Sequence, residues 1–396
     1  MKSSVSKAAV TLVVILGTAA SLGMMHLPAE VHEPESHAPP VLTQPPSEPK
    51  KRKPSTAPTL IAVIDTGIDI DHPVLKKRIW TNPGETGLDP QGRRREANGI
   101  DDDGNGYVDD VHGFDFTRSK DATEDEHGHG THIAGIIDEV SAESPVRYMS
   151  LVYYRNGIDG ESALKNSIEA VRYAIKMRVD IINYSGGGNL PNELEKAVFE
   201  EANRQGILVV AAAGNESNNS EKHPFYPANY RLPNILSVTA TEGRANDQSD
   251  RQSEEIPLVL PSSNYGSRSV AVAAPGKDIR STLPGGKFGT MTGTSQATAF
   301  VTGAAVRVLQ MAKDIGESPS PELVIEKLVA SGTVSLALKG KTRNSTHLDR
   351  REVDEMDAFA DKKVRRSRTQ SSYQKEFRSE FEKALRQEIS AGHGPL

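Results

Sequence analysis

The feature that most constrains the fold is an alternation of short apolar runs and amphipathic segments along the middle of the chain. Apolar runs rich in β-branched residues predict buried strands at 146–154, 180–184 and 207–215. The segments between them predict helices at 162–177 and 192–204, because their apolar residues recur at helical spacing. We therefore expect an α/β fold with a mostly parallel central sheet and helices on both faces.

Polar residues stand where the apolar runs end. The run 60–64 stops at Asp65, and the run beginning at Ile207 stops at Gly214 and Asn215. Ligands of open α/β sheets bind beyond the carboxyl ends of the strands. These side chains are therefore expected at one edge of the sheet, where a functional site would lie.

Two further motifs supply a nucleophile and a base. Ser295 stands where a glycine-rich loop meets a predicted helix, and helix N–H groups there stabilise negative charge. A serine hydroxyl is a weak nucleophile unless a general base, itself oriented by a third group, removes its proton. His129, at the start of another predicted helix, and Asp65 are residues of the required types. A Gly-Thr-Ser sequence alone is typical of a helix cap, so the inference depends on all three residues together.

With these residues in the order Asp65, His129, Ser295, the chain resembles the subtilisin-like serine peptidases (subtilases). The resemblance covers about 58–360, and its motifs are D-T-G, H-G-T-H-I-A-G, I-I-N-Y-S-G-G-G, A-A-A-G-N and G-T-S-x-A. It implies that Ser295 attacks a peptide carbonyl, that His129 transfers the proton and that Asp65 orients the imidazole. It also implies that Asn215 donates a hydrogen bond to the oxyanion.

The resemblance further implies a set of substrate-binding residues, namely Ser185, Gly186, Gly187, Gly214, Glu216 and Phe225. Two of them give opposite expectations for the primary pocket. Glu216 at its rim would favour a basic side chain, whereas Phe225 on its floor would favour a small one. The sequence alone leaves both alternatives open.

An acidic insert lies at 98–110, between Asp65 and His129. Oxygen ligands at alternating positions, with glycine for a sharp turn, are typical of calcium loops. We expect a structural calcium ion here, with the candidate ligands Asp101, Asp103, Asn105, the Tyr107 carbonyl and Asp109. The glutamate that completes such loops is missing, because His112 stands at its position. The alternative is an acidic surface turn, since Asp-Gly and Asn-Gly pairs also form plain turns.

Composition restricts the remaining possibilities. The net charge of −6 and the pI near 6.0 give no reason to expect a nucleic-acid partner. The chain has no cysteine, which excludes disulfides and thiolate metal sites.

The two ends of the chain differ in composition from its middle. Lys2 and Lys7 precede an apolar run, which indicates a secretory signal or an uncleaved membrane anchor. We therefore expect export to the periplasm or the medium, with membrane contact only if this segment is uncleaved. The expected organisation is a signal or anchor at 1–29, a Pro-rich linker at 30–58, a peptidase domain at 59–360, and a basic segment with an amphipathic helix at 361–396.

These observations predict an exported serine endopeptidase, a monomer, that hydrolyses peptides or proteins through an acyl-enzyme intermediate. Two alternatives stay open. The first is a peptide-binding or scaffolding protein that has lost turnover, against which the complete set of Asp65, His129, Ser295 and Asn215 argues. The second is a peptidase with a narrow processing role rather than a degradative one.

Overall fold

The computed structural model describes residues 56–121, 124–242 and 256–356. The predicted signal or anchor, most of the Pro-rich linker and the C-terminal segment from 361 lie outside these residues. Within the described residues, no helix combines the length and the apolar character that a membrane crossing requires.

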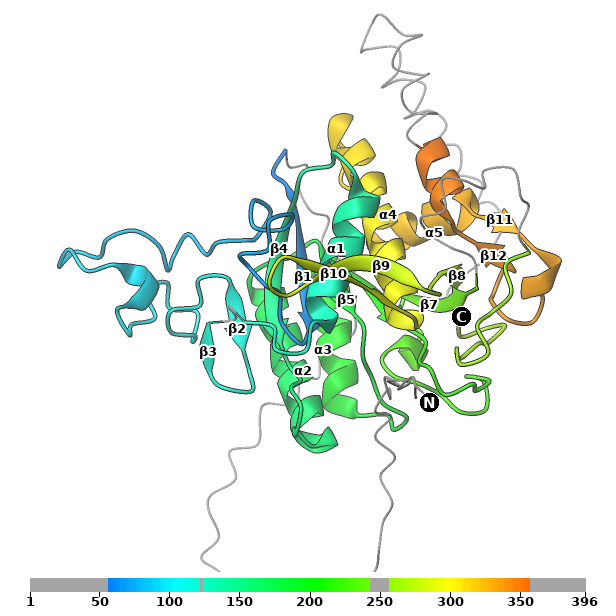
Figure 1. The fold of residues 1–396 in the computed structure, drawn as a ribbon, viewed down its shortest axis with the longest axis horizontal. Coiled ribbons are helices and arrows are strands. Elements are labelled where there is room, and N and C mark those ends of the chain that lie inside the picture. The colour runs from blue at the N-terminus through cyan, green and yellow to red at the C-terminus, as the bar shows by residue number, and fades with distance from the viewer. Residues whose placement is uncertain (1–55, 122–123, 243–255, 357–396) are drawn as a thin grey trace, which may run out of the picture. The chain divides into compact units, whose positions relative to one another are not determined.

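A ten-stranded sheet forms the centre of the fold, in the order β11-β12-β8-β7-β6-β5-β1-β4-β2-β3 (Figure 1). Its pairs are parallel except for β2 with β3 and β11 with β12. A separate antiparallel hairpin joins β9 to β10. The strands are β1 (Thr59–Asp65), β2 (Gly113–Asp115), β3 (Lys120–Asp121), β4 (Val146–Val152), β5 (Ile181–Tyr184), β6 (Leu208–Ala212), β7 (Ile235–Thr241), β8 (Val272–Pro275), β9 (Ile279–Leu283), β10 (Lys287–Met291), β11 (Thr333–Val334) and β12 (Thr346–His347).

The α-helices begin close to the positions that their sequence predicts. Asp159 accepts hydrogen bonds from two backbone N–H groups at the start of α2, and Asn192 does the same for α3. The cap at Asp159 explains why α2 begins before the predicted position 162. The helices are α1 (His129–Ser141), α2 (Gly160–Lys176), α3 (Glu193–Arg204), α4 (Thr294–Asp314) and α5 (Pro321–Ser331), with short 3-10 turns η1 (Arg95–Ala97), η2 (Ala228–Tyr230) and η4 (Leu336–Leu338).

Strand β1 separates two hydrophobic cores, because successive side chains of a strand point to opposite faces. Ile61 and Val63 belong to a core shared with α1, α4 and α5. Ala62 and Ile64 belong to a second core, shared with α2 and α3. The predicted α/β fold with helices on both faces of a mostly parallel sheet is thus confirmed.

Candidate active site

Four neighbouring strand ends form the edge on which the site is built. β6, β5, β1 and β4 lie side by side in the sheet, and their carboxyl ends lead into Ala213, Ser185, Thr66 and Tyr153. The register pairs Ile64 with Tyr184, so the next residues, Asp65 and Ser185, are adjacent at this edge. Neighbouring strands are about 4.8 Å apart, which brings side chains from distant parts of the sequence within reach of one another.

The structure joins Asp65 and His129 directly. The Nδ1 atom of His129 lies 2.7 Å from Oδ1 of Asp65, and the Thr66 backbone N–H donates to the same oxygen at 2.8 Å. A carboxylate can only accept, so Nδ1 carries the hydrogen and Nε2 is left as the basic nitrogen. Gly130 permits this approach, because an ideal Cβ there would lie only 2.1 Å from the Gly67 carbonyl oxygen.

The charge around His129 favours its protonated form. Burial disfavours an imidazolium, but the Asp65 carboxylate, its hydrogen bond and the Asp125 carboxylate outweigh burial and raise the pKa of His129 above its ordinary value. The ring is thus a stronger base than a free imidazole, as a proton acceptor for a serine should be.

Asp125 holds the loop that carries His129, and sequence reasoning missed it. Its Oδ1 accepts from the Thr66 hydroxyl at 3.0 Å and from the Gly128 N–H at 2.8 Å. Its Oδ2 accepts from the N–H and the hydroxyl of Thr131 at 2.9 and 2.6 Å. The side chain is 7% exposed, so its position depends on the assembled fold rather than on a local motif. The only sequence signal is its place just before the histidine-glycine run.

Ser295 is the second residue of α4 and is nearly buried. Its Oγ donates to the Ser185 carbonyl oxygen at 3.2 Å. In the described part of the chain no hydrogen bond joins Ser295 to His129. Ser295 is nevertheless bonded to the residue after β5, and His129 to the last residue of the neighbouring strand β1. Hydrogen bonds between catalytic groups are often long until substrate binds.

Asn215 is oriented by the residue next to Ser295. Its Oδ1 accepts from the backbone N–H and the hydroxyl of Thr294 at 2.9 and 3.1 Å. The Nδ2 atom lies 3.7 Å from the ideal Cβ position of Gly293, and no described residue accepts a hydrogen bond from it. An amide with its oxygen fixed in this way presents its N–H₂ group as a donor beside Ser295.

The predicted substrate-binding residues lie near Ser295 on the segments that follow β5 and β6, with Phe225 on a third segment. Gly188 exchanges two backbone hydrogen bonds with Tyr226, at 3.0 and 2.8 Å. The ideal Cβ position of Gly186 is 2.0 Å from the Tyr153 hydroxyl oxygen, so Tyr153 packs over this glycine. The structure thus brings together Ser185, Gly186, Gly187, Gly214, Glu216 and Phe225 beside Ser295 and Asn215.

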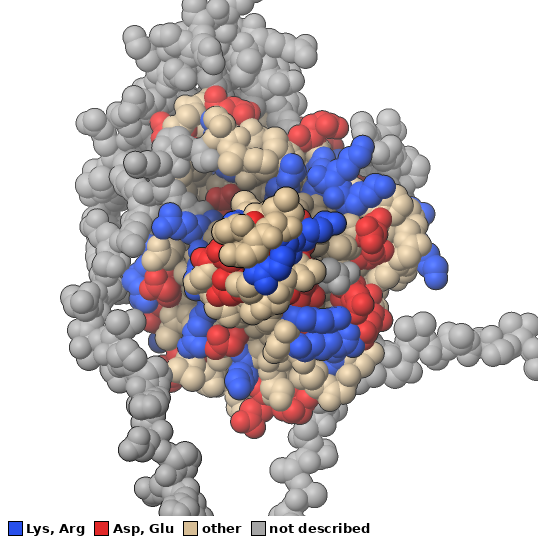
Figure 2. Space-filling view, turned by 90° about the vertical axis from the view of Figure 1, so that its left-hand side faces the viewer, with Lys and Arg blue, Asp and Glu red and all other residues tan. Residues whose placement is uncertain are grey.

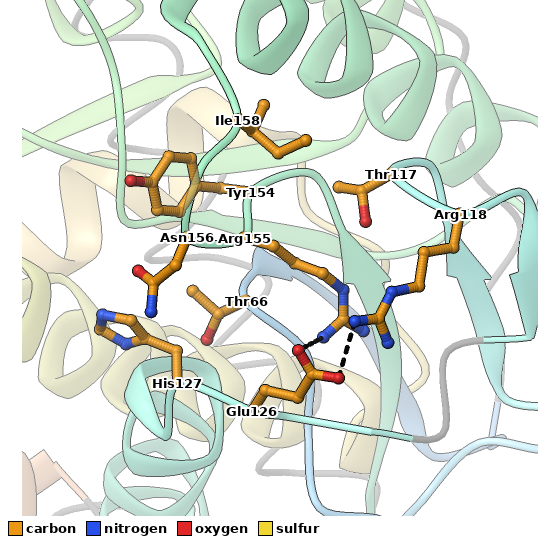
Figure 3. A pocket seen from close by; sticks show the side chains of 9 residues that line it. All are labelled: Thr66, Thr117, Arg118, Glu126, His127, Tyr154, Arg155, Asn156 and Ile158. Carbon is orange, nitrogen blue, oxygen red and sulfur yellow. Dashed lines mark hydrogen bonds and ion pairs between the residues drawn. The ribbon is translucent and has the colours of Figure 1, made fainter.

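A cavity of about 210 Å³ is lined by residues close in sequence to Asp65 and His129, among them Thr66 and His127 (Figure 3). Glu126 lies between two guanidinium groups, 2.7 Å from Arg118 and 3.2 Å from Arg155. The His127 ring, 6.3 Å from the His129 ring, lines the same cavity. The remaining lining residues are Thr66, Thr117, Tyr154, Asn156 and Ile158. Sequence reasoning missed this cavity, although Tyr154 and Arg155 follow the end of β4 as the strand-end rule would suggest.

In the acidic insert, the structure brings together a different set of ligand atoms from the predicted one. Glu85, Asp101 and Asp103 place carboxylate oxygens within 4.8 Å of one another. Asn105 Oδ1 accepts from the Tyr107 N–H at 2.7 Å, and both Asp109 oxygens lie 3.1 Å from the Gly99 N–H. Of the predicted carboxylates, Asp101 and Asp103 belong to the cluster and Asp109 does not, and Glu85 is an addition.

Glu85 is fully buried, and only one of its oxygens is satisfied. Oε1 accepts from the backbone N–H groups of Asp102 and Asp103 at 2.7 and 3.2 Å, whereas Oε2 has no hydrogen-bond donor among the described residues. Burial raises the pKa of Glu85 above its ordinary value, and the Asp110 and Asp103 carboxylates add to this effect. Carboxylate oxygens are the ligands that Ca²⁺ prefers, so this donor set fits a calcium ion.

The surface near the insert does not continue this acidic cluster. Figure 2, which turns the left-hand side of Figure 1 towards the viewer, shows acidic and basic side chains interspersed over this face. The Arg93–Asp89 pair, 2.7 Å apart, and the Arg95–Asp102 pair, 3.8 Å apart, are examples of opposite charges paired in and just before the insert. The cluster at Glu85 is thus a local feature.

Comparisons with known proteins agree with this geometry. A sequence model of the subtilase family matches residues 57–352. An intracellular serine protease of Paenibacillus polymyxa is 32% identical over 309 residues, which is 76% of this chain and 82% of that protein. Subtilisin-like protease 1 of Plasmodium berghei is 30% identical over 280 residues, 66% of this chain and 44% of that protein. The chain therefore spans less than half of the Plasmodium protein but most of the Paenibacillus one.

Solved structures support the fold. The crystal structure of a lanthipeptide protease aligns with a TM-score of 0.55 at 21% identity, covering 75% of this chain and 87% of that one. At this identity the likeness concerns the fold alone. Together with the match across residues 57–352, it confirms the resemblance on which the sequence interpretation depended.

Proposed function

Because the chain belongs to the subtilase family of serine peptidases, we propose that it is an exported serine endopeptidase acting on peptides or proteins. The observation that supports this proposal is that Ser295 and the Asp65–His129 pair are hydrogen-bonded at the ends of two neighbouring strands. Ser295 is hydrogen-bonded to Ser185 at the end of β5, and Asp65 ends the neighbouring strand β1. A nucleophile, a base and an orienting carboxylate thus meet at one edge.

The reaction follows from the roles of these groups. Nε2 of His129 takes the Ser295 hydroxyl proton while Oγ forms a bond to the substrate carbonyl carbon. The proton then passes to the amine as the peptide C–N bond breaks, leaving an acyl-enzyme. In the second half of the reaction, water attacks the acyl-enzyme carbonyl while His129 takes its proton. The proton then returns to Ser295 Oγ as the ester bond breaks and the acid leaves. Asp65 keeps the imidazole in the required tautomer and stabilises the imidazolium that forms.

We place the oxyanion between the Nδ2 group of Asn215 and the backbone N–H of Ser295. The support is the fixed orientation of the Asn215 amide, whose oxygen is held by Thr294. Removal of one such donor costs about 10²- to 10³-fold in kcat. An Asn215→Ala enzyme should therefore keep its reactive serine and lose most of its turnover.

A fluorophosphonate probe, which labels activated serines, tests the proposal. The purified protein should be labelled, Ser295→Ala should not, and the labelled protein should cleave peptides. A folded protein that is not labelled would contradict the enzyme and favour a binding protein that has lost turnover. Cleavage of folded proteins beside short peptides would separate a degradative enzyme from a narrow processing one, and light scattering would test the proposed monomer.

Export is a separate part of the proposal. It depends on Lys2 and Lys7 before an apolar run, whereas the Paenibacillus relative is named as intracellular. Cell fractionation with sequencing of the mature N-terminus would decide it. A mature chain that begins beyond residue 20 would support a cleaved signal; an intact chain in the cytoplasmic fraction would refute export.

We also propose that Glu85, Asp101 and Asp103 hold a structural calcium ion. Each contributes a carboxylate oxygen to the cluster, and the unpaired Oε2 of Glu85 is the group that most needs a cation. Gly84 leaves room for the Asp103 carboxylate, since an ideal Cβ there would lie 2.6 Å from its Oδ2. A bound ion would tie the turn at Glu85 to the loop at Asp101 and so stabilise the insert.

A further inference from the structure

The gap between two backbone segments determines which substrate side chain fits beside Ser295. One segment follows β5 and includes Ser185 to Gly188; the other follows β6 and includes Ala213 to Glu216. Ser295 Oγ contacts the first segment at the Ser185 carbonyl, and Thr294 is bonded to Asn215 in the second. The substrate-binding residues that the resemblance implies line this gap, and we expect the side chain of the residue that supplies the carbonyl carbon at Oγ to enter it.

The ring of Phe225 already fills the gap. An ideal Cβ at Gly187 would lie 2.6 and 3.0 Å from Cε1 and Cζ of this ring, and one at Gly214 would lie 2.9 Å from its Cγ. The ring thus spans from one glycine to the other, and the side chain is only 8% exposed. Both walls are glycine, so the ring takes the space that a substrate side chain would otherwise use.

The backbone holds Phe225 in this position. The next residue, Tyr226, exchanges two hydrogen bonds with Gly188 at 2.8 and 3.0 Å, which fixes the Phe225 segment to one wall of the gap. The Phe225 N–H also donates to the Asn229 side chain at 3.4 Å. Moving the Phe225 backbone away from this wall would therefore require breaking the Gly188–Tyr226 bridge.

Glu216, the residue that would favour a basic substrate, is turned towards Asn264. Its Oε2 accepts from Asn264 Nδ2 at 2.5 Å, and its own N–H donates to Asn264 Oδ1 at 3.1 Å. Asn264 is itself buried and donates to the Ala213 carbonyl at 2.9 Å. One oxygen of the Glu216 carboxylate is thus already engaged by Asn264, which is itself bonded to the β6 segment.

We infer that Phe225 determines specificity by restricting the residue on the acyl side of the cleaved bond to glycine, alanine or serine. This inference rests on the proposed peptidase function and names the substrate class for it. It decides between the two alternatives that the sequence leaves open, in favour of a small side chain. A large apolar or basic side chain would collide with the ring before its carbonyl reached Ser295.

Peptides that differ only in this residue, with alanine, phenylalanine or lysine, test the inference through their kcat/KM values. The wild-type enzyme should prefer alanine over both others. In Phe225→Gly the phenylalanine-to-alanine ratio should rise at least about 100-fold, as expected when a pocket gains room for several carbon atoms. The matched control is Phe288→Gly, which removes the same side chain from the half-exposed hairpin strand β10 and should leave the ratio unchanged.

Two further measurements separate the possible failures. Fluorophosphonate labelling of Ser295 is independent of this side chain, so a labelled wild-type enzyme that prefers phenylalanine or lysine would overturn the inference and leave the peptidase proposal intact. A preference for lysine that Glu216→Gln removes would assign specificity to Glu216 instead. If Phe225→Gly fails to fold, the wild-type profile and the smaller change Phe225→Leu decide the question by the same ratio.

Discussion

Asp65 and Glu85 are both almost completely buried, at 3% and 0% exposed, but the regions around them differ in what they need. Asp65 ends a central strand and faces the Nδ1–H of His129 at 2.7 Å. Glu85 lies in an irregular turn before the acidic insert and faces Asp101 and Asp103 of the insert, which are carboxylates like itself. A buried charge is stable only when it is paired or hydrogen-bonded.

The difference shows how each region completes its charge balance. The sheet edge contains its own counter-group, because the imidazole becomes an imidazolium during the proposed reaction and the Asp65 carboxylate stabilises it. The insert contains backbone donors for one oxygen of Glu85 and none for the other. The active site can therefore assemble from the chain alone, whereas the proposed calcium ion would supply the positive charge that the Glu85 cluster lacks.

Removing the charge of Asp65 should have the largest effect. Asp65→Asn leaves His129 without the acceptor that fixes its tautomer, and such a change lowers kcat by about 10⁴-fold in serine peptidase triads. Steady-state peptide hydrolysis measures it, with the exposed Glu143→Gln as the control for loss of a carboxylate near α1. Less than a tenfold loss in Asp65→Asn would mean that another carboxylate orients His129.

The same comparison explains what the sequence could predict. The sequence singles out Asp65, His129, Asn215 and Ser295 because each stands next to a predicted strand end or helix start, and the topology of a parallel sheet brings such positions to one edge. Glu85 could not be found in this way. It belongs to no motif, and it meets Asp101 and Asp103 only through the path of an irregular loop. The sequence also includes Asp109 in the calcium set, because alternation along a loop does not reveal that its carboxylate accepts from the Gly99 N–H, apart from the Glu85 cluster.

The position of Phe225 shows a second limit. Its sequence context, before Tyr226 and Pro227, indicates a position at the floor of the primary pocket and a small substrate side chain. Glu216 at the rim indicates a basic side chain instead, and the sequence does not decide between the two. Only the fold shows that Asn264 engages the Glu216 carboxylate while the ring of Phe225 reaches both Gly187 and Gly214. These contacts join residues that are distant in sequence, so no local pattern records them.

Calcium should have the next largest effect, and on stability rather than on chemistry. An ion that binds only the folded state adds about 2.7 kcal/mol at a hundredfold excess over its Kd, which corresponds to a rise in Tm of about 5–10 °C for a domain of this kind. Thermal unfolding with calcium and with a chelator measures it, using Ser295→Ala to prevent self-digestion. Equal Tm values in both conditions would show that the insert holds no ion and would leave the acidic turn as its explanation.

A pair of substitutions distinguishes the ligand set of the structure from that of the sequence. In the Ser295→Ala background, Glu85→Gln should abolish most of the calcium-dependent rise in Tm, because it removes the buried charge of the cluster. Asp109→Asn is the matched variant. In the wild type the Asp109 carboxylate accepts a hydrogen bond from the Gly99 N–H and is not part of the cluster, so the calcium-dependent rise in Tm should remain. The reverse result, with the rise lost in Asp109→Asn and kept in Glu85→Gln, would restore the set predicted from sequence.

The pH dependence of catalysis should show the smallest effect, and it returns to the Asp65 side of the comparison. The pKa of His129 is raised by the Asp65 and Asp125 carboxylates against the opposing effect of burial, so the imidazolium persists to higher pH. An imidazolium cannot accept the Ser295 proton, and kcat/KM should therefore fall on acidification with a midpoint above the ordinary value of about 6.5. In Asp65→Asn the residual activity should show a lower midpoint, because the carboxylate that stabilises the imidazolium is gone. A midpoint that stays in place in Asp65→Asn would show that the acidic limb belongs to a group other than His129.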